Sequence, residues 1–246
     1  MFLKLRPFLY SLFFLFNLEL IIFRSEWVFF VGILALLSAL LEGKRVGKQW
    51  KFAIFPFFFS LSSIILLYLI TLEFEQQIFI LLASFMYYLA VFGAYRLGLY
   101  EKDETARGMM MAVAVASIFF MYAGLYGLYL NFLVPLFVLM IAYFITTFLI
   151  SYQYFSIIRK DDPKKVLIYS FLLAFSMMEI IWTMNFWPFG YLTTGVIALI
   201  LYYVLWDIIQ SHFLDKLSKK KIVANMVFFS MMIGFVLITS KWIPII

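Results

Sequence analysis

Long apolar segments separated by short polar ones constrain the fold of this chain more than any other feature. The longest polar segments, 42–51, 98–107, 156–165 and 212–221, are about ten residues each. A helix that crosses a bilayer needs about 20 mostly apolar residues. The composition agrees, because 66% of the residues are hydrophobic and 13% are charged, against roughly 45–50% and 25% in soluble domains. The chain is therefore predicted to be an all-α, polytopic integral membrane helical bundle.

Nine segments have the length and composition of transmembrane helices. They lie at 8–23, 27–41, 52–72, 77–97, 108–127, 131–152, 166–185, 189–209 and 222–240. Only Arg24, Ser25 and Glu26 separate the first two, so these spans form a tight hairpin, or one of them is tilted or crosses partly. No small-residue cleavage site follows the first span, which indicates an uncleaved signal-anchor helix. We expect residues 1–246 to form a single transmembrane domain with no soluble domain.

The basic residues predict an orientation. With nine spans, all of the 19 Lys and Arg residues except Arg24 and Lys241 fall on one side of the membrane. Lys and Arg accumulate in cytoplasmic loops, so the N-terminus is expected inside and the C-terminus outside. We expect the inner Lys clusters to bind anionic lipid headgroups and the cell (plasma) membrane to be the location. The positive net charge thus records orientation, and we expect no nucleic acid partner.

Several chemistries are excluded by what the sequence lacks. One His and no Cys exclude a multi-histidine metal centre and an H-E-x-x-H protease. There is no phosphate-binding Gly-Lys-Ser/Thr loop and no Gly-x-Ser-x-Gly nucleophile turn. We therefore expect no metal and no cofactor.

Glu179 is the outstanding polar residue inside a predicted span. It lies in the outer half of span 166–185, where an ionisable group is energetically expensive. Ser176 and Thr183 fall on the same helical face at i−3 and i+4. Because no Lys or Arg lies at this depth, we predict that Glu179 is buried against protein, is mostly protonated, and bonds a polar group of a neighbouring span. Both a substrate or ion site and a purely structural hydrogen bond remain open.

The turn that follows this span supplies further polar candidates. Asn185 begins a turn that contains Pro188 and Gly190, and Thr193 and Thr194 lie one turn inside the next span. An antiparallel hairpin predicts that these residues lie near Glu179. The alternative is an aromatic-belt turn that anchors the hairpin at the membrane surface.

Two other spans carry one-sided patterns. The fourth span has a polar face, which indicates either a pore or, in preference, a hydrogen-bonded helix interface; its residues are Gln77, Ser84, Tyr88 and Tyr95. The fifth span has a face of small residues, which predicts close helix packing; its residues are Ala112, Ala116, Ala123 and Gly127.

The inner end of the eighth span contains Asp207, His212 and Asp215. His212 and Asp215 are an i, i+3 pair, so a general acid–base pair at the membrane surface is conceivable. It has no recognisable nucleophile or metal partner. A solvated helix end is therefore the preferred interpretation.

Three functions are carried forward. The first is transport of a small solute or ion through the bundle, with Glu179 as the central residue. The second is a non-catalytic membrane subunit or scaffold that packs against partner membrane proteins, either as a homo-oligomer or with a different subunit. The third and least favoured is a membrane-surface lipid-modifying enzyme.

Overall fold

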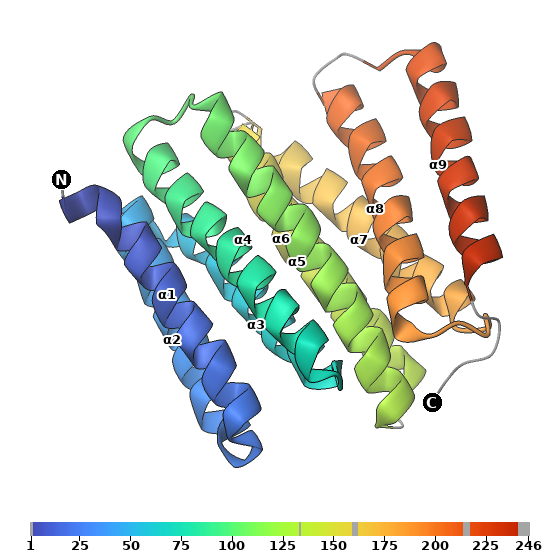
Figure 1. Cartoon of the computed structure of the whole chain (residues 1–246). Helices are drawn as coiled ribbons and strands as arrows, with labels where there is room; N and C mark the ends of the chain where they lie inside the picture. The colour runs from blue at the N-terminus through green and yellow to red at the C-terminus, as the bar shows by residue number, and fades with distance from the viewer. Residues whose placement is uncertain (1, 133, 159–161, 214–216, 241–246) are drawn as a thin grey trace. The chain divides into compact units, whose positions relative to one another are not determined.

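The computed structural model describes residues 2–132, 134–158, 162–213 and 217–240. Within these ranges the chain is all-α and contains no strand, which confirms the predicted helical bundle. The helices (Figure 1) are α1 (Phe2–Phe23), α2 (Val28–Gly47), α3 (Ile54–Leu69), α4 (Glu73–Leu99), α5 (Glu104–Asn131), α6 (Leu136–Ile158), α7 (Pro163–Met184), α8 (Tyr191–Phe213) and α9 (Lys219–Thr239). Two 3₁₀ turns, η1 (Ser25–Trp27) and η2 (Trp50–Ala53), precede α2 and α3.

Every predicted span corresponds to one of these helices, but α2 differs from the rest. In the described part of the chain, eight helices are long and apolar enough to cross a membrane, and α2 is not among them. The reason is that Glu42, Lys44 and Arg45 lie in its last turns. Its 20 residues are nevertheless about 30 Å long, which equals the thickness of a typical hydrocarbon core.

The chain divides into two compact units. Unit 1 comprises the described residues of Met1–Met121 and Gln153–Lys160, and unit 2 those of Tyr122–Tyr152 and Asp161–Ile246. Both units consist of the predicted spans and their short connections. The prediction of a single transmembrane domain stays a prediction.

In unit 1, α1 packs against α2 and α4. The turn between α1 and α2 is as tight as predicted, because the Trp27 amide donates to the Arg24 carbonyl at 3.0 Å. The ring of Phe14 stacks on Tyr87 with centroids 4.2 Å apart, and Gln77 donates to Glu19 Oε2 at 3.2 Å. Residues later in α1 thus contact residues earlier in α4, so the two helices are antiparallel.

The C-terminal ends of α2 and α4 lie against each other. A Cβ added to Gly98 would be 2.9 Å from the carbonyl oxygen of Gly47, which shows that the two backbones touch there. Lys48 ends α2 in the left-handed conformation, with φ of 61°. Gly47 and Gly98 allow the two backbones to approach this closely. The contact brings the basic residues in the last turn of α2 near the C-terminal end of α4.

Asp103 holds the connection from α4 to α5 in place. Its Oδ2 pairs with Arg96 Nε at 2.7 Å, and its Oδ1 accepts a hydrogen bond from the Ala106 amide at 3.1 Å. This is the geometry of an N-cap for α5. The bond from Ala106, assisted by the nearby Arg96, lowers the pKa of the Asp103 carboxyl below its ordinary value of 3.8.

Unit 2 has a buried network of hydroxyl groups. Tyr122 Oη and Thr147 Oγ1 lie 2.5 Å apart, and Tyr143 donates to the Tyr122 carbonyl at 2.7 Å. The Ser151 and Tyr202 hydroxyls lie 3.2 Å apart. Every one of these five residues is buried, and the bonds tie α5, α6 and α8 together.

The small-residue face predicted for the fifth span holds in part. Ala123 and Gly127 of α5 are buried, and Ala123 Cβ would lie 2.7 Å from a Cβ added to Gly195 of α8. Ala116 is half-buried, and Ala112 is exposed. Close packing is therefore confirmed at Ala123, and the prediction is wrong for Ala112, where the α5 face is not covered.

Candidate functional site

Glu179 is exposed on α7, so its predicted burial is wrong. The buried face of α7 is formed by a different stripe, which includes Leu173, Met177 and Ile181. Glu179 follows Met177 by two residues, or about 200° around the helix, and therefore points away from that stripe. Among the described residues, no side-chain hydrogen bond or ion pair of Glu179 occurs.

The other residues of this predicted site do not gather around Glu179. Ser176 is half-buried, and Thr183 is exposed and donates to the Ile180 carbonyl at 2.7 Å. Asn185 is half-buried at the C-terminal end of α7. Thr194 is buried and bonds the Tyr126 hydroxyl of α5, whereas Thr193 faces Ser240 with 3.5 Å between their hydroxyl oxygens.

The predicted polar face of α4 contains both exposed and buried side chains. Gln77 is exposed and bonds Glu19, and Ser84 is buried without a hydrogen-bond partner among the described residues. Tyr88 and Tyr95 are half-buried, and both stack on Phe92, at 5.4 and 6.4 Å between ring centroids. These ring contacts are within α4 itself, and the interpretation of this face as a helix interface stays a prediction.

The acid–base candidates at the end of α8 have separate neighbours. Asp207 accepts a hydrogen bond from Asn225 of α9 at 2.5 Å. His212 is exposed, and its ring contacts Tyr169 of α7 edge-on at 5.8 Å. Asp215 lies outside the described residues. Among the described residues, Asp207 and His212 thus contact different helices.

A buried carboxyl that sequence reasoning did not select lies in unit 1. Glu42 is only 6% exposed, and its Oε2 accepts a hydrogen bond from Tyr87 Oη at 2.6 Å. Tyr87 lies 11 residues before Gly98, or about 16 Å along α4, so the pair is inside the bundle. Sequence analysis placed Glu42 in a polar loop, but it continues the buried face of Ala35 and Ala39. That helical spacing was the available signal.

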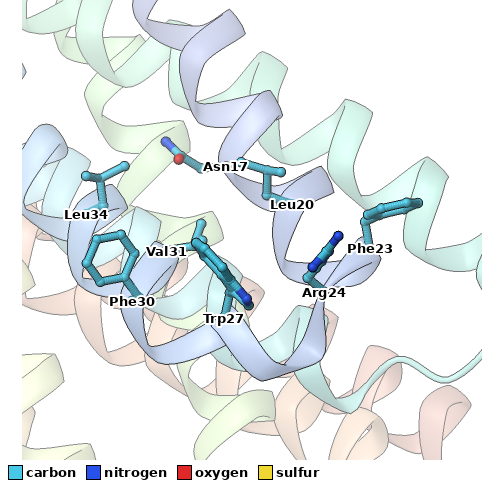
Figure 2. Close-up of a pocket in the computed structure, with 8 residues that line it drawn as sticks. All are labelled: Asn17, Leu20, Phe23, Arg24, Trp27, Phe30, Val31 and Leu34. Atoms are coloured by element: carbon cyan, nitrogen blue, oxygen red, sulfur yellow. The ribbon is translucent and has the colours of Figure 1, made fainter.

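A cavity lies between α1 and α2 beside their connecting turn (Figure 2). Its volume is about 470 Å³. Eight residues line it: Asn17, Leu20, Phe23, Arg24, Trp27, Phe30, Val31 and Leu34. Asn17 and Val31 are buried and form its floor, and the six others are exposed. The cavity is thus an open, mainly apolar groove with two polar residues.

Most of the chain matches a known protein family. Residues 34–239 match a family described as protein of unknown function (DUF5656). The chain belongs to the DUF5656 family. The matched DUF5656 region contains Glu42, Tyr87 and Glu179, whereas the groove residues other than Leu34 precede it. No curated protein and no solved structure matches the chain.

Proposed function

We propose that this multi-pass membrane protein is a non-catalytic subunit that binds a transmembrane helix of a different protein through one face of α7. The observation that carries the proposal is the exposed carboxyl of Glu179 on a helix whose surroundings are apolar. Intramembrane carboxyls almost always face protein or a water-filled cavity. A partner helix would meet this requirement.

The depth of Glu179 supports this requirement. It lies five residues before the end of α7 at Met184, or about 7 Å along the helix axis. Side chains on a helix point back toward its N-terminus, so the carboxyl is directed deeper than its own Cα. Trp182, which follows it, is of the residue type that marks the membrane interface.

The neighbours of Glu179 resemble the composition of an interface. Phe175 and Trp182 fall at i−4 and i+3, and both side chains are exposed. Thr183 is exposed beside them. Large aromatic residues around a hydrogen-bonding group are typical of the residues that contribute most to binding energy.

The partner is inferred from charge. This face presents one acidic group and no basic one, so a helix with Lys, Arg, Asn or Gln at matching depth complements it. A symmetric contact between two copies would pair two Glu179 carboxyls with each other and would supply neither a basic nor an amide partner. A different polypeptide is therefore favoured over a second copy.

A photo-crosslinking residue at Thr183, in the native membrane, tests this proposal. We expect one discrete adduct with a polypeptide other than this chain. The same experiment in a Glu179→Leu background should reduce the adduct at least about fivefold, and Glu179→Gln should retain most of it because Gln still hydrogen-bonds. Glu75→Leu, a change at an exposed Glu of α4, is the matched control and should have no effect. Adducts with lipid alone, with a second copy alone, or unaffected by Glu179→Leu would contradict the proposal.

Transport is a second candidate function, and Glu42 favours it. This carboxyl is buried inside unit 1 and bonded to Tyr87, which is the kind of interior ionisable group that proton and ion pathways use. Under this alternative, Glu42 takes the role that sequence analysis gave to Glu179.

A further inference from the structure

We propose that the groove between α1 and α2 binds an anionic glycerophospholipid, with its phosphate at Arg24 and one acyl chain along the apolar wall. The groove lies in unit 1 and the α7 face in unit 2, so this proposal is independent of the partner-binding function. It rests on three observations: the shape and lining of the groove, an unpartnered buried amide in its floor, and a single charged residue at its end.

The volume and lining suit an acyl chain. At about 470 Å³, the groove is within the range of about 300–1,000 Å³ found for small-molecule pockets. Leu20, Phe30 and Leu34 are its apolar walls, and all three are exposed. The groove thus opens sideways from the hairpin, which is the direction from which a lipid in the bilayer would enter.

The floor contains a hydrogen-bond donor without an acceptor. Asn17 is 2% exposed, and its Nδ2 has no hydrogen-bond partner among the described residues. Leaving a buried amide unsatisfied is energetically costly, because the group loses its hydrogen bond to water without gaining another. A ligand with a carbonyl or ester oxygen at this depth would remove that cost, whereas a plain hydrocarbon would not. The donor therefore selects a lipid with an ester group near its head.

Arg24 is the only charged residue among the eight that line the groove. It lies in the turn that joins the two helices, where no ion pair of its side chain occurs among the described residues. The nearest acidic residues do not neutralise it: Glu26 is exposed and does not line the groove, and Glu19 bonds Gln77. Guanidinium groups bind phosphate in a bidentate manner, so the head of the ligand is anionic.

The order of these groups along the hairpin matches the order of groups in a phospholipid. Figure 2 shows Arg24 and Asn17 at different ends of the lining residues. Seven residues separate them, or about 10 Å along the helix axis. Trp27, beside Arg24, is 52% exposed and is of the type found at the headgroup level. The phosphate, the ester carbonyl and the acyl chain would thus meet Arg24, Asn17 and the apolar wall in sequence.

Trp27 also supplies a signal for the test. The full-length protein in a neutral detergent is titrated with phosphatidylglycerol that carries a brominated acyl chain, and the quenching of tryptophan fluorescence is measured. Trp27→Phe identifies the part of the signal that comes from the groove. We expect saturable quenching that depends on Trp27, tighter binding of brominated phosphatidylglycerol than of brominated phosphatidylcholine, and no displacement by inorganic phosphate at equal ionic strength.

Two variants and one control separate this site from general lipid binding. Arg24→Gln should weaken binding about tenfold, and Leu34→Phe, which narrows the groove, should also weaken it with Arg24 intact. Arg6→Gln is the matched control, because it removes the same charge from an exposed position elsewhere on α1, and it should bind like the wild type. Equal affinity for the two lipids, quenching unchanged by Leu34→Phe, displacement by inorganic phosphate, or equal losses from Arg24→Gln and Arg6→Gln would overturn the proposal.

Asn17→Leu distinguishes a ligand-binding amide from a structural one. A ligand that binds the folded state raises its melting temperature. In lipid-free detergent we expect Asn17→Leu to melt no lower than the wild type, since it removes an unsatisfied buried group, and to lose most of the rise that phosphatidylglycerol produces. A large fall in the lipid-free melting temperature, with the rise retained, would assign Asn17 to folding and contradict its role as a ligand.

Discussion

At the scale of single residues, the pair of Glu42 and Tyr87 is the most consequential contact in unit 1. The tyrosine is 1% exposed and the glutamate 6%, so water does not replace the hydrogen bond between them when it is lost. A buried polar group left without its partner carries the full desolvation penalty, whereas a surface group is rehydrated. This contact therefore ties α2 to α4 by a bond whose removal has a measurable effect.

Substitutions at Glu42 and Tyr87 have different expected outcomes. Tyr87→Phe leaves the carboxyl without its donor and should lower the free energy of unfolding by about 1–3 kcal/mol, measured by thermal or denaturant melting in detergent. Glu42→Gln keeps an acceptor oxygen and should have a smaller effect. If unit 1 conducts protons or cations, Glu42→Gln should also abolish flux into vesicles that contain the reconstituted protein. Folding retained with unchanged flux would remove Glu42 from any pathway and leave it a structural residue.

At the scale of helices, α5 and α8 of unit 2 approach closely at Ala123 and Gly195. A Cβ on Gly195 would lie 2.9 Å from the Ala123 Cα as well as 2.7 Å from its Cβ, so the obstruction is backbone and cannot rotate away. Gly195→Ala should therefore push the helices apart and destabilise the protein by about 1–3 kcal/mol. The control is Gly234→Ala in α9, where nothing lies within 4 Å; because Ala favours a helix over Gly by about 1 kcal/mol, it should be neutral or stabilising. Equal melting temperatures for the two variants would contradict this packing.

The positions of the helices along the chain were predictable from the sequence. Which face of each helix is buried was harder to predict. Spans were readable because apolar runs of membrane length are a strong signal. Which face of a membrane helix is buried was not readable in the same way, since lipid-facing and protein-facing residues are both apolar. Glu179 was assigned to the interior because an ionisable group facing lipid is energetically expensive, and it is exposed; Glu42 was assigned to a loop and is buried. The groove at Asn17 and Arg24 depends on how two helices meet, which no single segment encodes.

At the scale of the whole molecule, the basic residues relate the helices to the two sides of the membrane. In unit 1, the contact of Gly47 with Gly98 places the C-terminal ends of α2 and α4 at the same level. This agrees with the assignment of Lys44, Arg45 and Arg96 to one side. It also indicates that α2 runs back to the side of the membrane that holds the C-terminal end of α4, although its last turns are charged.

Reporter fusions test the orientation, and α2 decides the outcome. If α2 crosses, fusions after Lys51, Lys165 and Lys221 should report the cytoplasm, and fusions after Glu26 and Ile246 should report the exterior. If α2 does not cross and the N-terminus stays cytoplasmic, the four loops with several basic residues would change sides together, and the fusion after Lys51 would report the exterior. That result would place nearly all of the Lys and Arg residues outside, against the strong preference of basic loops for the cytoplasm. We therefore expect α2 to cross the membrane. If the fusions after Glu26 and after Lys51 both report the exterior, α2 lies in the membrane without spanning it.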